Sequence, residues 1–121
     1  MSDIKQLISI IIPVFNESES IGFLLDEVIN VMSFHKFNFE LIVVNDGSKD
    51  NTHKVLKQLT LKIQELSVIS LRKNYGQTAA MSAGFDNSKG DIIITLDGDL
   101  QNDPNDICLL YTSDAADEVD R

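Results

Sequence analysis

The sequence has very little cysteine and no long apolar run, and these two absences exclude several classes of protein. Its single cysteine, Cys108, allows no intrachain disulfide and no cluster of thiolates around a metal ion. The apolar run near the N-terminus ends at Pro13 without a small-residue cleavage site, which argues against a signal peptide. No run reaches the roughly 18 to 20 apolar residues that span a bilayer. We therefore expect the chain as given to be soluble and cytoplasmic.

Basic residues are also scarce. The chain has 10 Lys and Arg against 19 Asp and Glu, and its formal charge is −9. A surface of this sign argues against a nucleic-acid partner, because such partners are bound through clustered basic residues. The 121 residues, 43% of them hydrophobic, are enough for one domain with one ordinary core. If so acidic a protein handles phosphorylated substrates, it needs a cation to do so.

The most informative stretch that is present is Asp91–Pro104, DIIITLDGDLQNDP. Ile92–Leu96 is rich in β-branched residues and is bounded by glycines, which predicts a strand buried on both faces. The two-residue period of an extended chain allows Asp97 and Asp99 to point to the same side, while Gly98 lets the backbone turn or a ligand approach. Two such carboxylates suit a hard divalent cation. Taken alone, the short and common pattern is more typical of a solvated acidic turn than of a metal site.

Three further strands, each followed by a helix, are predicted upstream. Apolar residues at positions 21, 24, 25, 28, 31 and 32 have the spacing of one helix face. Asn16 with Glu19 resembles an N-terminal capping pattern for that helix, and Asp50 is expected to cap the next one. The predicted strands are Leu7–Phe15, Phe39–Val44 and Val68–Leu71, and the predicted helices are Ser18–Met32, a second from Asn51 or Thr52, and Gln77 to about Asn87. This alternation predicts an α/β fold with a doubly wound parallel sheet.

Each predicted strand ends in polar or glycine-containing turn residues. The carboxyl ends of parallel strands share one edge of the sheet, where open α/β folds bind their ligands. Four separate loops therefore supply the same edge, which favours a metal and ligand site over a solvated turn at Asp97 and Asp99. The residues expected to converge there are Asn16 and Glu17, Asp46 and Gly47, Asn74 and Gly76, and Asp97 and Asp99.

Four ordered motifs, IIIPVFNES, IVVNDGSKDNT, RKNYGQTAAMSAGF and TLDGDLQNDP, together resemble family 2 glycosyltransferases of the GT-A fold. The resemblance extends from residue 7 to about residue 107. It is strongest to the polyprenyl-phosphate branch, which includes dolichol-phosphate mannose synthase and bactoprenol glucosyltransferase. It implies a Rossmann-like GT-A nucleotide-binding half with a mainly parallel sheet and flanking helices. It also implies a UDP- or GDP-linked sugar donor, a lipid-phosphate acceptor and a divalent metal, Mg2+ or Mn2+.

The resemblance implies nucleotide-binding roles for residues after the first two strands. Pro13, Phe15 and Glu17 would line the base and ribose pocket. Asp46 would hydrogen-bond the edge of the nucleobase, and Gly47 would leave room for it. The alternatives from local structure are that Pro13 only ends a strand and that Asp46 only forms a turn.

The resemblance implies catalytic and metal-binding roles for the motif after the fourth strand. Asp97 would lie near the ribose and the metal, Asp99 would ligate the metal, and Gln101 would join it. Arg72 and Gln77 are expected to face either a diphosphate or solvent, and Tyr75 either stacks on a base or packs in the core or at a rim. The two histidines, at positions 35 and 53, are isolated, and we expect both at the surface.

The last residues depart from the family pattern. Residues 1–107 are expected to form the nucleotide-sugar-binding part of a GT-A domain, and residues 108–121 to be a non-native tail, because that string resembles a translated sequencing adapter. The chain is accordingly expected to be truncated, to bind nucleotide and to be inactive. The longer parent protein would act at the cytoplasmic face of the membrane, which it would contact only through its missing C-terminal part.

Two other classes of protein remain open. A nucleotide-sugar-binding or nucleotidyltransferase module also uses parallel strands and metal carboxylates, but its glycine- and arginine-rich first loop is not found in this sequence. A receiver-like signalling domain would need an acidic pair after the first strand and a lysine after a later one. Neither feature is in place.

Overall fold

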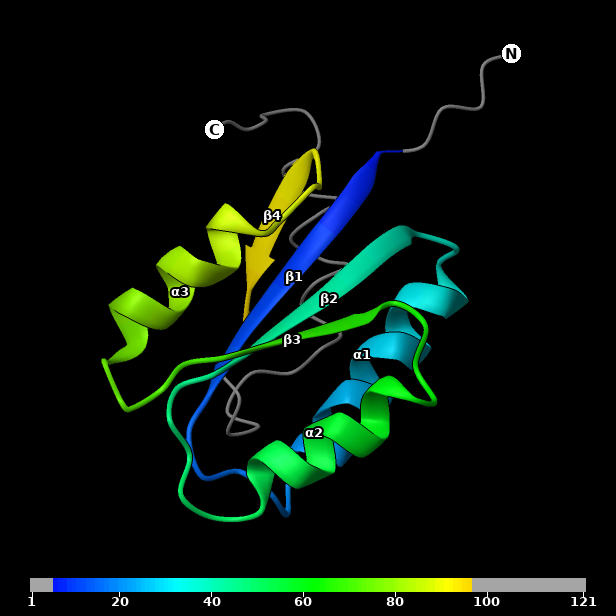
Figure 1. The fold of residues 1–121 in the computed structure, drawn as a ribbon. Coiled ribbons are helices and arrows are strands. Elements are labelled where there is room, and N and C mark those ends of the chain that lie inside the picture. The colour runs from blue at the N-terminus through cyan, green and yellow to red at the C-terminus, as the bar shows by residue number, and fades with distance from the viewer. Residues whose placement is uncertain (1–5, 97–121) are drawn as a thin grey trace.

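The computed structural model describes residues 6–96, and these form a four-stranded parallel sheet with three flanking helices (Figure 1). The predicted alternation of strands and helices is confirmed, with element ends displaced by no more than three residues from their predicted positions. The elements are β1 (Leu7–Val14), α1 (Ile21–Phe34), β2 (Asn38–Asn45), α2 (Thr52–Thr60), β3 (Leu66–Ser70), α3 (Gln77–Asp86) and β4 (Ile92–Thr95).

The strand order is β3-β2-β1-β4, and every neighbouring pair is parallel. The chain first builds outwards from β1 to β3 and then returns to place β4 on the other side of β1. The order therefore reverses between β1 and β4, which is where doubly wound folds bind their ligands. A receiver-like domain would place β1 between β2 and β3. The strand order excludes that alternative.

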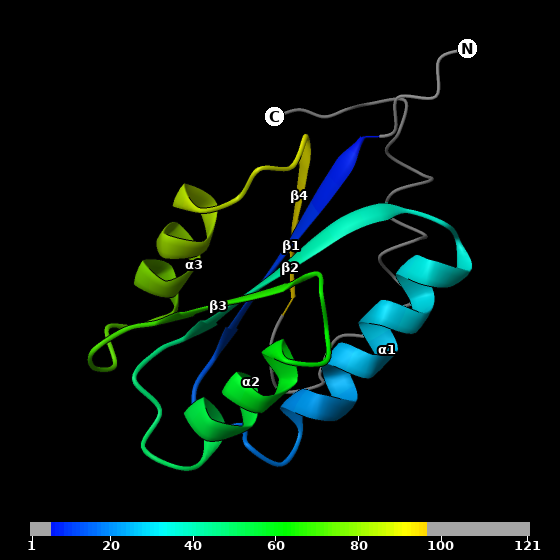
Figure 2. The same ribbon diagram turned by 45° about the vertical axis from the view of Figure 1, so that its right-hand side comes forward.

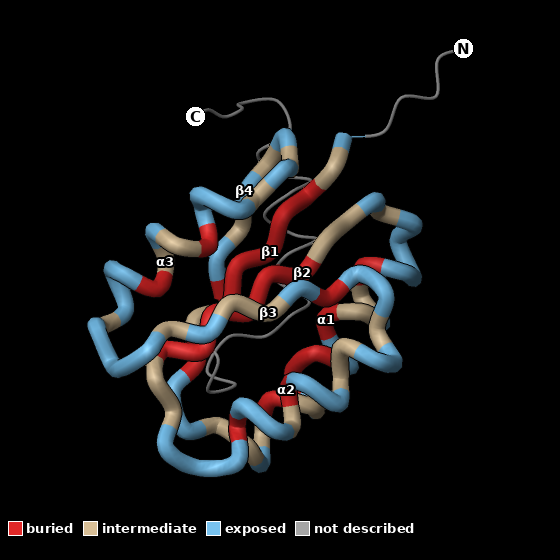
Figure 3. The backbone as a smooth tube through the Cα atoms, viewed as in Figure 1, coloured by how far each residue is buried: buried red, intermediate tan, exposed pale blue. Residues whose placement is uncertain are grey.

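Helices α1 and α2 lie on one face of the sheet, and α3 lies on the other (Figures 1 and 2). Alternate residues of β1 supply the two faces: Ile10 and Ile12 pack in the α1–α2 core, and Ile11 packs with Ala80 of α3. This double burial explains why β1 and β2 have almost continuous apolar runs. Figure 3 shows the buried backbone concentrated along these two central strands.

The predicted apolar face of α1 is confirmed, but its predicted cap is wrong. The helix begins after Ser20, whose hydroxyl donates to Glu17 Oε1 at 2.9 Å. Asn16 does not cap the helix with Glu19, because its side-chain oxygen accepts hydrogen bonds from the loop after β2 instead. Five of the six residues predicted for the apolar face are buried: Ile21, Leu24, Leu25, Val28 and Met32.

Close packing of α3 on the sheet depends on its small residues. Ala80 and Gly84 are its buried residues, whereas Ala79 is exposed. A Cβ atom on Gly84 would lie only 2.4 Å from Ile11 Cγ2. A side chain at this position would therefore force Ile11 or the helix to shift.

The prediction that the fourth strand is buried on both faces is wrong for β4. Ile93 is 42% exposed, and Thr95 is exposed as well. Among the described residues β4 is an edge strand, and α3 packs mainly over β1 and β2. The second face of β4 is therefore left uncovered by residues 6–96.

Candidate functional site

Three loops come together at the carboxyl edge of the sheet, and they contain most of the predicted ligand-binding residues. These loops span residues 15–20 after β1, 46–51 after β2 and 71–76 after β3. The described part of β4 ends at the same edge, where the Leu96 N–H donates to the carbonyl of Ile11 at 3.0 Å. Asp97, Asp99 and Gln101 lie outside the described residues.

Asp46 joins the loop after β2 to the loop after β3. Its carboxylate accepts hydrogen bonds from the backbone N–H of Tyr75 at 2.8 Å, from that of Gly76 at 3.0 Å and from Asn74 Nδ2 at 3.1 Å. The residue is only 4% exposed. The carboxylate therefore holds residues 74–76 in place, a role that the turn-forming chemistry of an Asp-Gly pair does not predict.

The close contact between the loops after β2 and β3 also requires a glycine at position 47. Its backbone has φ 70°, a left-handed conformation that favours glycine. A Cβ atom there would lie 2.2 Å from the carbonyl carbon of Lys73 and 2.3 Å from the amide nitrogen of Asn74. The space beside Gly47 is thus filled by another backbone segment. The expectation that Gly47 leaves room for a nucleobase stays a prediction.

The loop after β1 is joined to the loop after β2 by hydrogen bonds in both directions. Asn16 has φ 55°, and its Oδ1 accepts from the backbone N–H of Lys49 at 2.8 Å and of Asp50 at 3.4 Å. The Asn16 N–H donates to Ser48 Oγ at 2.8 Å, and the N–H of the next residue, Glu17, donates to Thr52 Oγ1 at 2.9 Å.

Asp50 completes this connection. Its carboxylate accepts from the Thr52 hydroxyl at 2.5 Å, from the Thr52 N–H at 2.8 Å and from the Ser18 N–H at 3.4 Å. The bond from the Thr52 hydroxyl is the main reason that the pKa of Asp50 lies below its ordinary value. The N-cap position of α2 is Asn51, so Asp50 supports the start of α2 from one residue upstream. We call Asn16, Asp50 and Thr52 the loop clamp.

Within residues 6–96, the remaining predicted nucleotide contacts lie at this edge. Pro13 pairs with Val44 and lies beyond the last pair of β1 with β4, so its missing N–H breaks no hydrogen bond to β4. Phe15 is 40% exposed. Glu17 is partly buried, and its carboxylate accepts from Ser20. The fold therefore places these residues beside Asp46, while their roles toward a nucleotide stay predictions.

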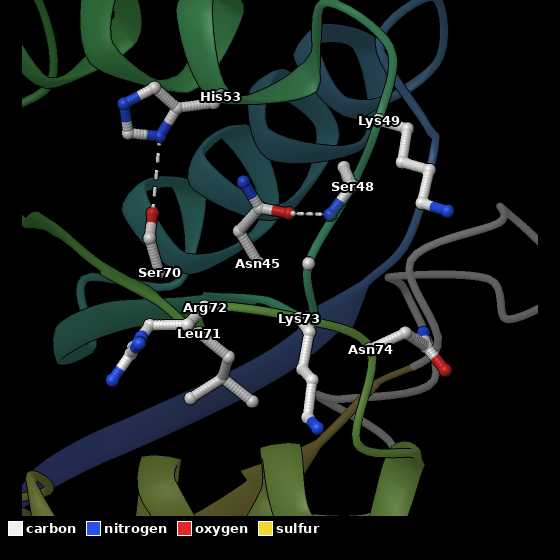
Figure 4. A pocket seen from close by; sticks show the side chains of 10 residues that line it. Asn45, Ser48, Lys49, His53, Ser70, Leu71, Arg72, Lys73 and Asn74 are labelled. Carbon is white, nitrogen blue, oxygen red and sulfur yellow. Dashed lines mark hydrogen bonds between the residues drawn. The ribbon is translucent and has the colours of Figure 1, made fainter.

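A pocket of about 490 Å³ opens between the loops after β2 and β3 (Figure 4). The side chains of Lys49, Arg72 and Lys73 point in different directions there and do not converge on a common point. His53 Nδ1 lies 3.2 Å from Ser70 Oγ. The lining residues are Asn45, Gly47, Ser48, Lys49, His53, Ser70, Leu71, Arg72, Lys73 and Asn74. The charges do not form a focused anion site, and Arg72 is exposed to solvent.

The other candidate side chains are at the surface. Tyr75 is 54% exposed, and Lys73 Nζ lies 5.4 Å from its ring centre, so it belongs to a rim and not to the core. His35 and His53 are exposed, as predicted. Within residues 6–96 no group of three acidic, histidine or cysteine side chains is placed to hold a metal ion. The same residues contain no helix of the length and apolarity needed to cross a bilayer.

The sequence-based prediction missed Ser48 and Thr52 as connecting residues. The available signal was the density of Asn, Ser, Asp and Thr after β2, because these side chains bind nearby backbone groups and compete with regular structure. That signal identifies the residue types but gives no partner. The partners lie 32 to 35 residues away in the loop after β1.

Comparison with known proteins assigns the fold to a family. Residues 9–120 match the family described as Glycosyl transferase family 2. The chain belongs to this family. The match extends into residues 108–120, which lie outside the described residues, so the non-native origin of the tail stays a prediction.

The sequence relatives of this glycosyltransferase domain include two bacterial enzymes of polyprenyl-phosphate sugar transfer. Dodecaprenyl-phosphate galacturonate synthase of Rhizobium johnstonii is 45% identical over 101 residues, which is 83% of this chain and 30% of the relative. Undecaprenyl-phosphate 4-deoxy-4-formamido-L-arabinose transferase of Proteus mirabilis is 44% identical over 101 residues, or 83% of this chain and 31% of the relative. The chain thus spans roughly a third of the length of these proteins.

Solved structures confirm the GT-A fold of the domain. The mannosyltransferase PcManGT of Pyrobaculum calidifontis, in complex with GDP-Man and Mn2+, matches with a TM-score of 0.70 at 21% identity, covering 79% of this chain and 28% of that one. Glucosyl-3-phosphoglycerate synthase of Mycobacterium tuberculosis, in complex with Mn2+, UDP and phosphoglyceric acid, also scores 0.70, at 22% identity over 88% of this chain and 38% of that one.

Proposed function

We propose that this domain binds the nucleotide-sugar donor of a glycosyltransferase whose acceptor is a polyprenyl phosphate. The observation that carries the proposal is the 44 to 45% identity with two transferases that are both named for polyprenyl-phosphate products or acceptors. The donor would be a UDP- or GDP-linked sugar, since structural neighbours hold nucleotides of both kinds. The enzyme would serve glycan or cell-wall biosynthesis at the cytoplasmic face of the membrane.

The nucleotide would lie against the loops after β1 and β2. The exposed ring of Phe15 offers an apolar surface, and Pro13 and Glu17 flank it. Asp46 Oδ1 accepts one hydrogen bond from protein, whereas Oδ2 accepts two. Because a carboxylate oxygen has two lone pairs, Oδ1 keeps one acceptor position for an N–H on the edge of a nucleobase. The anchoring and the ligand-binding roles of Asp46 are therefore compatible.

Asp99 and Gln101 would hold Mg2+ or Mn2+, because carboxylate and amide oxygens are the donors that such hard cations prefer. When bound, the cation would offset the negative charge that grows on the nucleotide diphosphate as it leaves. Asp97 would position the ribose. In the transfer itself, an oxygen of the acceptor phosphate bonds to the anomeric carbon as the bond to the donor diphosphate breaks. A phosphate acceptor is already anionic near neutral pH, so no catalytic base is required.

The proposal is tested by calorimetric titration of UDP and GDP into this chain, with and without Mn2+. We expect one of the nucleotides to bind only when the metal is present. Asp99→Asn should abolish this metal-dependent binding. Asp86→Asn, which changes an exposed acid at the end of α3, is the matched control and should bind as the wild type does.

The Proteus mirabilis relative, titrated in parallel, serves as the reference protein. Absence of metal-dependent binding of UDP and GDP by both proteins would refute the donor-site assignment. The same samples, supplied with polyprenyl phosphate and candidate donor sugars, test the expectation that the 121-residue chain binds nucleotide without transferring sugar.

A further inference from the structure

We propose that the loop clamp of Asn16, Asp50 and Thr52 holds the predicted nucleotide-contacting residues in their binding positions before a nucleotide arrives. The three residues act as positioning residues and do not contact the nucleotide. The inference rests on the proposed donor site, because it concerns how the walls of that site are fixed. It adds a role to side chains that neither the motif resemblance nor the family match assigns.

The hydrogen bonds of the clamp run from each loop to the backbone of the other. Asn16, in the loop after β1, accepts from two amides of the loop after β2. In return Asp50 accepts from Ser18, and Thr52 accepts from Glu17. Because each loop supplies side-chain acceptors to the amides of its neighbour, neither can shift without breaking bonds of both. The two loops therefore form one rigid body.

The clamp lies directly between the residues that are predicted to contact the nucleotide. Asn16 separates Phe15 from Glu17, and its left-handed backbone turns the chain between them. Asn adopts this conformation more readily than most residues and also supplies the side-chain oxygen that the neighbouring loop requires. Thr52 is fully buried, and its hydroxyl both donates to Asp50 and accepts from Glu17. The placement of Phe15 and Glu17 thus depends on the hydrogen bonds that Asn16 and Thr52 make to the neighbouring loop.

A preorganised pocket binds more tightly because less conformational freedom is lost on binding. If the clamp were open, the loop after β1 would have to be ordered by the nucleotide itself. The entropy lost when the backbone of one residue is fixed raises the free energy of binding by an amount equivalent to about a tenfold loss of affinity. We therefore expect loss of the clamp to weaken nucleotide binding by at least about tenfold, although no residue that touches the nucleotide has been altered.

The test compares nucleotide affinity among clamp variants by titration with UDP or GDP in the presence of Mn2+ at low temperature. Asn16→Gly retains the left-handed backbone but removes the side-chain acceptor, and Thr52→Val is isosteric but lacks the hydroxyl. Both should bind at least about tenfold more weakly than the wild type. Thr52→Ser restores the hydroxyl and should bind within about threefold of the wild type.

Ser9→Ala controls for a general loss of stability. Ser9 is fully buried near the start of β1, at the end of the sheet opposite the three loops. Its hydroxyl accepts from the Gly90 N–H and donates to Glu40. Its replacement should lower the melting temperature but leave nucleotide affinity unchanged. If the clamp variants lost no more affinity than Ser9→Ala at matched stability, the positioning role would be refuted.

Hydrogen exchange provides a readout that does not depend on any ligand. In Asn16→Gly the amides of Lys49 and Asp50, in the opposite loop, should exchange faster, while the amides of the β1–β2 ladder should not. Unchanged exchange at both amides would overturn the clamp itself. If neither the wild-type chain nor the Proteus mirabilis relative bound UDP or GDP, the proposed function and the positioning role would both be overturned. The exchange result would still decide whether the hydrogen bonds hold the two loops together.

Discussion

Replacing Asp46 with Asn should destabilise the protein even when no nucleotide is present. The carboxylate is 4% exposed and accepts three hydrogen bonds from residues 74–76. An Asn side chain has a single acceptor oxygen, so at least one of its two terminal atoms becomes a donor facing other donors. If the oxygen remains opposite the N–H of Tyr75, the new amide group faces both the N–H of Gly76 and Nδ2 of Asn74.

The magnitude follows from the bonds that are lost. Hydrogen bonds to a charged group contribute about 1.5 to 3 kcal/mol each, and neighbouring losses are less than additive. Two bonds lost at Asp46 therefore correspond to about 2 to 4 kcal/mol of unfolding free energy. Asn74 and Tyr75 are already exposed, so residues 74–76 can partly shift and form hydrogen bonds to water instead. This limits the loss of unfolding free energy.

The measurement is urea unfolding of the wild-type and Asp46→Asn chains without nucleotide. We expect the midpoint to fall while the slope with denaturant stays constant, which indicates a change in stability without a change in compactness. Asp86→Asn makes the same chemical change at an exposed position and should stay within about 0.5 kcal/mol of the wild type. A loss of less than about 0.5 kcal/mol for Asp46→Asn would refute the anchoring role, since it would mean that the three bonds contribute nothing net.

Two further predictions concern packing and pH. Gly84→Ala should lower the unfolding free energy by about 1 to 3 kcal/mol, because the new methyl group would lie 2.4 Å from Ile11 Cγ2. The same substitution at Gly22 of α1, where a methyl group would meet no atom within 4 Å beyond the adjacent residues and the backbone of its own helix, should instead stabilise by about 0.5 to 1 kcal/mol. Equal effects of the two substitutions in denaturant melts would contradict the packing argument. Because the pKa of Asp50 is lowered in the folded chain, its stabilising contribution is present above about pH 4 and is lost as the pH falls through that lowered pKa. The difference in melting temperature between wild type and Asp50→Asn should therefore be largest near neutral pH and shrink in acid, and a constant difference would refute the assignment.

The sequence alone determined the order and type of the elements, because these depend on local periodicity. The spacing of apolar residues identified the buried face of α1. The turn residues after each strand located the candidate site at one edge, since parallel strands place all their carboxyl ends together. The four motifs were also sufficient to suggest the family that the comparisons confirm.

Only the tertiary structure decided how these pieces are joined. Asp46 and its donors are 28 to 30 residues apart, and Asn16 and its donors 33 to 34, so no local pattern indicates the pairings. The exposure of Ile93 likewise depends on where α3 lies, which the continuous apolar run of β4 cannot specify. Periodicity records which face of an element is buried, whereas hydrogen bonds between distant loops depend on strand order. The strand order β3-β2-β1-β4 brings the loops after β1, β2 and β3 into contact and turns separate polar motifs into one site.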